Sequence, residues 1–131
     1  MTKSTWRSHN KMYESKLRKA SSVLPGVSYE IRRISYAGRL ELLKQVRELV
    51  GKREFYEASE KAPDRLEAEI VSREIRLSML RWGLLSLDGL EIDGEPATVE
   101  DAIRRGPEAL AEEAASAIEA QLSLSEEERK N

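Results

Sequence analysis

Apolar and polar residues alternate with a two-residue period early in the chain. Val27, Tyr29 and Ile31 are separated by polar residues, and this period is typical of a strand with one buried face. Pro25-Gly26 is a turn signal between residues 27–34 and a candidate strand before it. Because two strands alone are marginal in water, we expect this hairpin to lie on a helix or to pair with a third strand.

Apolar residues then recur every three or four positions, a spacing that predicts helices. The first helix should begin near Tyr36, with Ser35 as its N-cap, and run to about Ser59. Gly51 lies inside it, at a cost of about 1 kcal/mol relative to alanine, and could mark a kink or a close contact. The expected buried stripe contains Leu40, Leu43, Val46, Leu49, Val50 and Phe55.

The second helix should have Pro63 in its first turn and end at Asp88-Gly89. It carries two neighbouring stripes, which together form a broad apolar face, so we expect it to be central and packed on both sides. One stripe contains Leu66, Ile70, Arg73, Leu77, Leu80 and Leu84, and the other contains Val71, Ile75, Ser78, Trp82 and Leu85.

The last third of the chain predicts a short strand and two further helices. Residues 89–97 alternate around an Asp-Gly turn and are the candidate third strand. Thr98 should cap the next helix, with Asp101 in the capping-box position, and Gly106-Pro107 should interrupt it. An alanine-rich final helix follows and should be able to approach another helix closely.

These elements predict a mainly α fold, a helical domain with a small N-terminal β-hairpin or three-stranded β element. The length of 131 residues suits one domain. Residues 1–15 have no clear period, so we expect a flexible basic arm there, followed by a single mostly helical domain over residues 16–131.

Charge is unevenly distributed along the chain. Residues 1–20 carry six basic side chains against one acidic, a net charge of +5, whereas the chain from Asp88 onward carries four basic against thirteen acidic, a net charge of −9. The basic start permits contact with nucleic acid or an acidic partner, but the acidic end argues against nucleic acid binding as the main function. One group of residues resembles a basic, aromatic nucleic-acid surface: Tyr29, Arg32-Arg33, Tyr36 and Arg39. We favour the alternative that these residues form the solvent face of an edge strand.

The chemistry of a catalytic site is missing from the sequence. The chain has no cysteine and a single histidine, His9, so thiolate metal sites and a Ser-His-Asp triad are not expected. It also has no glycine-rich phosphate loop and no apolar run of membrane-spanning length. We therefore expect a soluble, cytoplasmic, non-enzymatic protein without cofactor or metal.

The region around Trp82 is unusually apolar for a small domain. Trp82 alone is typical of a core residue, but we expect part of the surrounding set to form an exposed partner-binding patch. The candidate partner-binding residues are Trp82, Leu84, Leu85, Leu87, Leu90 and Ile92.

Several segments of the chain carry a resemblance to one known protein family. They are Trp-Gly-Leu at 82–84, Gly-Leu-Glu-Ile-Asp-Gly-Glu-Pro-Ala-Thr at 89–98, Arg-Gly-Pro-Glu-Ala-Leu at 105–110 and the terminal Leu-Ser-Glu-Glu-Glu-Arg-Lys-Asn. With the strand at 27–34 running into residues 35–43, they resemble the tail assembly chaperones of tailed bacteriophages and prophages over residues 23–131.

The resemblance implies a function carried out by protein–protein contacts. Such chaperones bind the tape measure protein, bring major tail tube subunits to it, and leave the finished tail. It also implies self-association, no active site, and a place in the cytoplasm of the bacterial host cell. Two alternatives stay open: a structural virion protein such as a tail completion protein, and a nucleic-acid-associated regulatory phage protein that uses the basic N-terminal arm.

Overall fold

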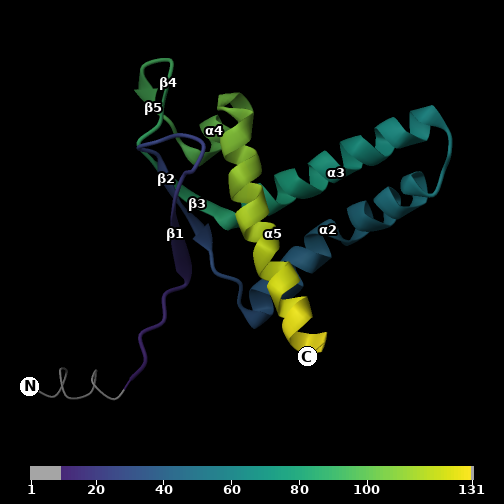
Figure 1. The fold of residues 1–131 in the computed structure, drawn as a ribbon, viewed down its shortest axis with the longest axis horizontal. Coiled ribbons are helices and arrows are strands. Elements are labelled where there is room, and N and C mark those ends of the chain that lie inside the picture. The colour runs from purple at the N-terminus through teal and green to yellow at the C-terminus, as the bar shows by residue number, and fades with distance from the viewer. Residues whose placement is uncertain (1–9, 131) are drawn as a thin grey trace, which may run out of the picture.

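The computed structural model describes residues 10–130, with the side chains of the last helix described as far as residue 122. These residues contain helices, a three-stranded antiparallel sheet and a separate two-stranded hairpin. The predicted mainly α fold with a small β element is confirmed (Figure 1). Residues 1–9 of the predicted basic arm lie outside the described residues. The helices are α2 (Tyr36–Glu57), α3 (Ala62–Gly83), α4 (Val99–Arg105) and α5 (Glu108–Lys130).

The predicted hairpin is confirmed. Strand β1 (Lys16–Ala20) runs antiparallel to β2 (Ser28–Arg32). Tyr29 and Ile31 of β2 are buried, as the alternation of the sequence requires. Gly26, in the connection, has a φ of +88°, which glycine adopts without steric cost.

The third strand is β3 (Leu84–Asp88), so the prediction that residues 89–97 supply it is wrong. For the same reason α3 ends at Gly83 and not at Asp88-Gly89. The leucines after Gly83 suit a helix face as well as a strand. Pairing with β2 favours the strand, because it buries Leu84 and lets Ser86 Oγ donate to Glu30 Oε1 at 2.7 Å. Strand β2 is therefore the central strand.

Residues 89–97 contain a separate small hairpin, in which β4 (Glu91–Ile92) pairs with β5 (Glu95–Pro96). Asp93 and Gly94 both have positive φ, 53° and 82°, as a two-residue type I′ turn requires. The predicted turn is thus present, but β3 already occupies the place beside β2.

A helical hairpin formed by α2 and α3 projects away from the sheet (Figure 1); we call it the helical arm. Ser35 Oγ accepts a hydrogen bond from the Gly38 amide at 3.0 Å, and Pro63 lies in the first turn of α3, so both predicted helix starts are confirmed. Buried positions recur three or four residues apart, as in a coiled coil. They are Leu42 and Val46 on α2, and Ala68, Val71, Ile75, Met79 and Trp82 on α3; Leu80 and Gly83 of α3 are buried as well.

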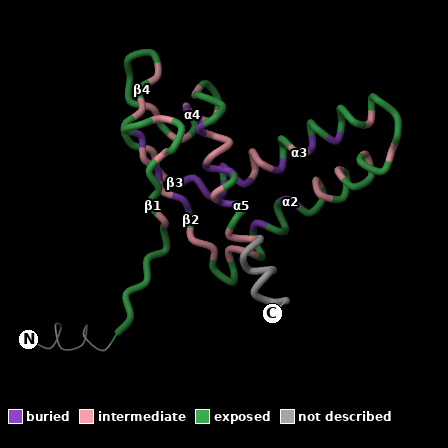
Figure 2. The backbone as a smooth tube through the Cα atoms, viewed as in Figure 1, coloured by how far each residue is buried: buried purple, intermediate pink, exposed green. Residues whose placement is uncertain are grey.

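The core lies where the sheet, the end of α3 and α5 meet (Figure 2). Helix α5 faces this core with Ala114, Ala115 and the fully buried Ile118. Its close approach to α3 is set at Gly83, where an added Cβ would lie 2.8 Å from Ile118 Cδ1. The predicted break at Gly106-Pro107 separates α4 from α5.

Candidate functional site

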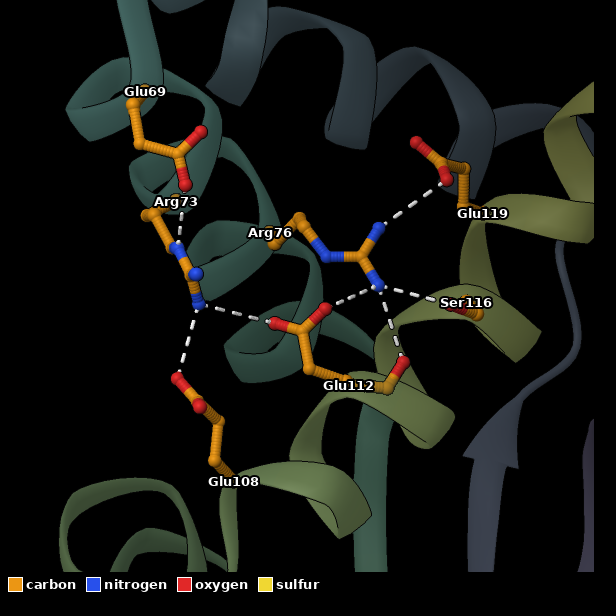
Figure 3. Close-up of polar contacts among 7 residues, drawn as sticks. All are labelled: Glu69, Arg73, Arg76, Glu108, Glu112, Ser116 and Glu119. Atoms are coloured by element: carbon orange, nitrogen blue, oxygen red, sulfur yellow. Dashed lines mark hydrogen bonds and ion pairs between the residues drawn. The ribbon is translucent and has the colours of Figure 1, made fainter. Parts of the chain in front are cut away.

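The base of the helical arm is fixed to α5 by arginine side chains (Figure 3). Arg76 donates to the Glu112 carbonyl at 3.1 Å and to Ser116 Oγ at 2.9 Å. The same guanidinium forms ion pairs with Glu112 and Glu119, at 3.2 and 3.4 Å. Arg73 joins the network through Glu112 at 3.6 Å. Together with the Gly83 contact, these bonds set the direction in which the arm leaves the body.

Trp82 is the point where the arm, the sheet and α2 meet. It is 4% exposed, and an added Cβ on Gly38 would lie 3.2 Å from its ring. The Arg32 guanidinium stacks over the ring at 5.0 Å, while Arg32 Nε donates to the Trp82 carbonyl at 3.0 Å. A cation over an indole face is stabilising when it is partly desolvated. Trp82 is therefore a structural junction.

The candidate partner-binding residues around Trp82 differ in exposure. Trp82 and Leu84 are buried, so their inclusion in an exposed patch is wrong, whereas the interpretation of Trp82 as a core residue is confirmed. Leu87 and Leu90 are partly buried against the core, and Ile92 has intermediate exposure. Leu85 is 39% exposed. The reason is that residues 84–88 form a strand, which sends alternate side chains to opposite faces. Partner binding by the less buried residues stays a prediction.

The residues of the basic, aromatic surface considered for nucleic acid do not form one exposed surface either. Tyr29 is buried, and burial, followed by the nearby Glu113 charge, raises its pKa. Arg32 lies over Trp82, and Arg33 lies over the Tyr13 ring at 5.0 Å. The explanation as an edge-strand solvent face is wrong as well, because β2 is the central strand.

An uncovered apolar face runs along α2. Leu40 and Leu43 were expected in the core, yet they are 51% and 47% exposed. With Val46 and Val50 they line a shallow groove of about 320 Å³, whose remaining lining residues are Lys44 and Arg47. Leu42 and Val46 are the buried residues of α2, so Val46 lies at the buried edge of the groove. A helix cannot turn both stripes toward the same neighbour.

The far half of the helical arm exposes further apolar side chains. Phe55, expected in the core, is 72% exposed and packs edge-on against Tyr56, with ring centroids 5.4 Å apart. Leu66 and Ile70 of α3 were expected in a packed stripe, but are 62% and 43% exposed. Gly51 marks no close contact, since an added Cβ would meet nothing within 4 Å. The arm therefore packs mainly on itself.

The carboxylates with resolved pKa shifts are explained by structural bonds. Hydrogen bonds from Arg81 and Arg104 lower the pKa of Glu100, and bonds from Thr98 lower that of Asp101. Among the side chains that the structure describes, no group of three or more His, Asp or Glu is placed to hold a metal ion. No described helix is long and apolar enough to cross a membrane.

Comparisons with protein-family models, curated protein sequences and solved structures gave no match.

The α2 groove was not singled out from the sequence, although a signal for it was present. The apolar residues of α2 fall into two sets, one containing Leu42 and Val46 and the other Leu40, Leu43 and Val50. If both sets are counted as one broad stripe, the sequence does not show that a single neighbouring helix covers only one of them. The groove is a candidate docking surface because its lining combines apolar side chains with two cations.

Proposed function

We propose that this protein binds a helical segment of another protein along α2, and that it acts as a tail assembly chaperone of a tailed bacteriophage in the cytoplasm of the host cell. The observation that carries the binding proposal is the half-exposed pair Leu40 and Leu43 beside the groove. Two leucines with half their surface in water, three residues apart on a rigid helix, favour a packed partner.

The spacing supports a helix as the occupant. Leu40, Leu43, Arg47 and Val50 follow the three-and-four pattern with which one helix packs on another. A third helix laid beside α2 would make the two-helix arm a three-helix bundle. Partner helices with apolar residues at such spacing are the usual ligands of grooves of this type.

The resemblance to tail assembly chaperones supplies the biological setting. The proposed partners are the tape measure protein, which is long and helical, and the major tail tube protein. Chaperoning of this kind needs apolar surface and no active site. The helical arm, which exposes several large apolar side chains while its base is fixed to the body, is compatible with that role.

Co-expression with the tape measure protein encoded beside this chain tests the proposal. We expect the tape measure protein to stay soluble, to be recovered by pull-down of this chain, and to carry many copies of it by light scattering. A tape measure protein that stays insoluble would contradict the proposal. Retention of this chain in purified virions would favour a tail completion protein, and salt-sensitive DNA binding that requires residues 1–20 would favour a nucleic-acid role.

A further inference from the structure

We infer that the α2 groove selects an acidic amphipathic helix of a partner protein, one with apolar residues along a seam and carboxylates beside it. The inference rests on the proposed function in one respect only, the use of α2 as a docking surface. It specifies the chemistry of the partner, which neither the apolar spacing nor the resemblance supplies.

The charge of the groove is of one sign. Its ionisable lining residues are Lys44 and Arg47, and no carboxylate lines it. Among the side chains that the structure describes, neither cation takes part in an ion pair. The arginines at the base of the arm differ, because Arg73 and Arg76 are engaged by glutamates of α5. The two groove cations remain available to a partner.

The positions of these cations match the flanks of a helical seam. Arg47 occupies a seam position between Leu43 and Val50, and Lys44 follows Leu43 directly. In paired helices, charges at and beside the seam choose the partner, because a like charge opposite them is repelled. A helix flanked by lysine would place like charges against Lys44 and Arg47, whereas one flanked by glutamate would pair with both.

Binding of designed peptides tests the inference with the full chain. One dye-labelled peptide of about three heptads carries leucine at its seam and glutamate at the flanking positions, and its twin carries lysine there. Fluorescence anisotropy should show the glutamate peptide binding about tenfold more tightly, as two exposed ion pairs allow. The preference should shrink as salt is raised. Equal binding of the two peptides would overturn the inference.

Variants locate the binding on α2. Leu40→Gln with Leu43→Gln should weaken the glutamate peptide at least about tenfold, because both leucines lose their apolar contact. Leu66→Gln is the matched control, since Leu66 is also exposed but lies on α3 away from the groove; it should bind as the unchanged chain does. Lys44→Glu with Arg47→Glu should reverse the peptide preference. A circular dichroism melt verifies that each variant folds.

Two other occupants would overturn the inference, and each has its own signature. If a second copy of the chain occupied α2, light scattering would show a dimer that Leu43→Gln dissociates, and neither peptide would bind. The chain's own acidic end, with Glu126, Glu127 and Glu128, would block the peptide in the full chain and admit it after removal of residues 123–131.

Failure of this inference differs from failure of the proposed function. If the double glutamine variant keeps the tape measure protein soluble as well as the unchanged chain does, the chaperone role stands, whereas docking on α2 and the inference built on it are wrong. If the glutamate peptide binds α2 while the tape measure protein precipitates, the α2 inference stands and the chaperone role is wrong.

Discussion

Gly83→Ala should destabilise the protein, although alanine is the better helix former. The added Cβ would lie 2.8, 3.0 and 3.2 Å from Cδ1, Cγ1 and Cγ2 of Ile118, whereas carbon atoms pack best at about 3.5–4.0 Å. Ile118 is fully buried and branched at Cβ, so it has little freedom to move aside. Overpacking of this kind costs about 1–3 kcal/mol, and the gain in helix propensity is at most about 1 kcal/mol.

The expected net loss is about 1–2 kcal/mol in the free energy of unfolding, measured by urea titration, or roughly 4–8 °C in Tm. Gly51→Ala is the matched control, because an added Cβ meets nothing there; it should stabilise by about 0.5–1 kcal/mol. Ile118→Val removes the nearest atom, so Gly83→Ala should cost less in that background. A Gly83→Ala protein as stable as the unchanged chain would refute the packing argument.

Three further changes probe other bonds of the fold. Arg76→Met should cost about 1–3 kcal/mol in urea unfolding, because the bonds from Arg76 to α5 are lost; no change would show that they contribute nothing. Thr98→Ala should cost about 1 kcal/mol through loss of the α4 cap, with Thr98→Ser as the control that retains it. Burial raises the pKa of Glu113, but hydrogen bonds from Ser22 and Ser21 outweigh it and lower the pKa below its usual value of 4.5. The carboxylate therefore stabilises the fold above that pH and loses its effect as pH falls through the lowered pKa. Glu113→Gln should be less stable than the unchanged chain at pH 7, and the difference should vanish in acid; a constant difference would contradict this.

Signals that are satisfied within a few residues were predicted from the sequence. Ser35 bonds to the amide three residues on, and Thr98 and Asp101 satisfy each other, so each helix start depends on its own neighbourhood. Pro25-Gly26 and Asp93-Gly94 likewise mark turns whose geometry is local.

Features decided by distant partners were not predicted. The end of α3 at Gly83 follows from the pairing of residues 84–88 with β2, more than fifty residues earlier. In the sequence, Leu40 and Leu43 cannot be told from core leucines, because they are equally apolar and equally spaced. Only the position of α3 shows that they stay uncovered. The Trp82 junction depends on Arg32 from the sheet, which no helical pattern reveals.

The geometry of the helical arm has a consequence for how its reach can vary among related chains. Two antiparallel helices that meet along one repeating seam keep their register when both gain or lose the same number of whole heptads at the connecting loop. Each heptad added to both helices would move the tip outward by about 10 Å, leaving Trp82 and the arginine bonds at the base untouched. An insertion in α2 alone, before Leu42, would instead rotate Leu42 and Val46 away from their buried positions. Length changes in this region should therefore come as paired multiples of seven residues.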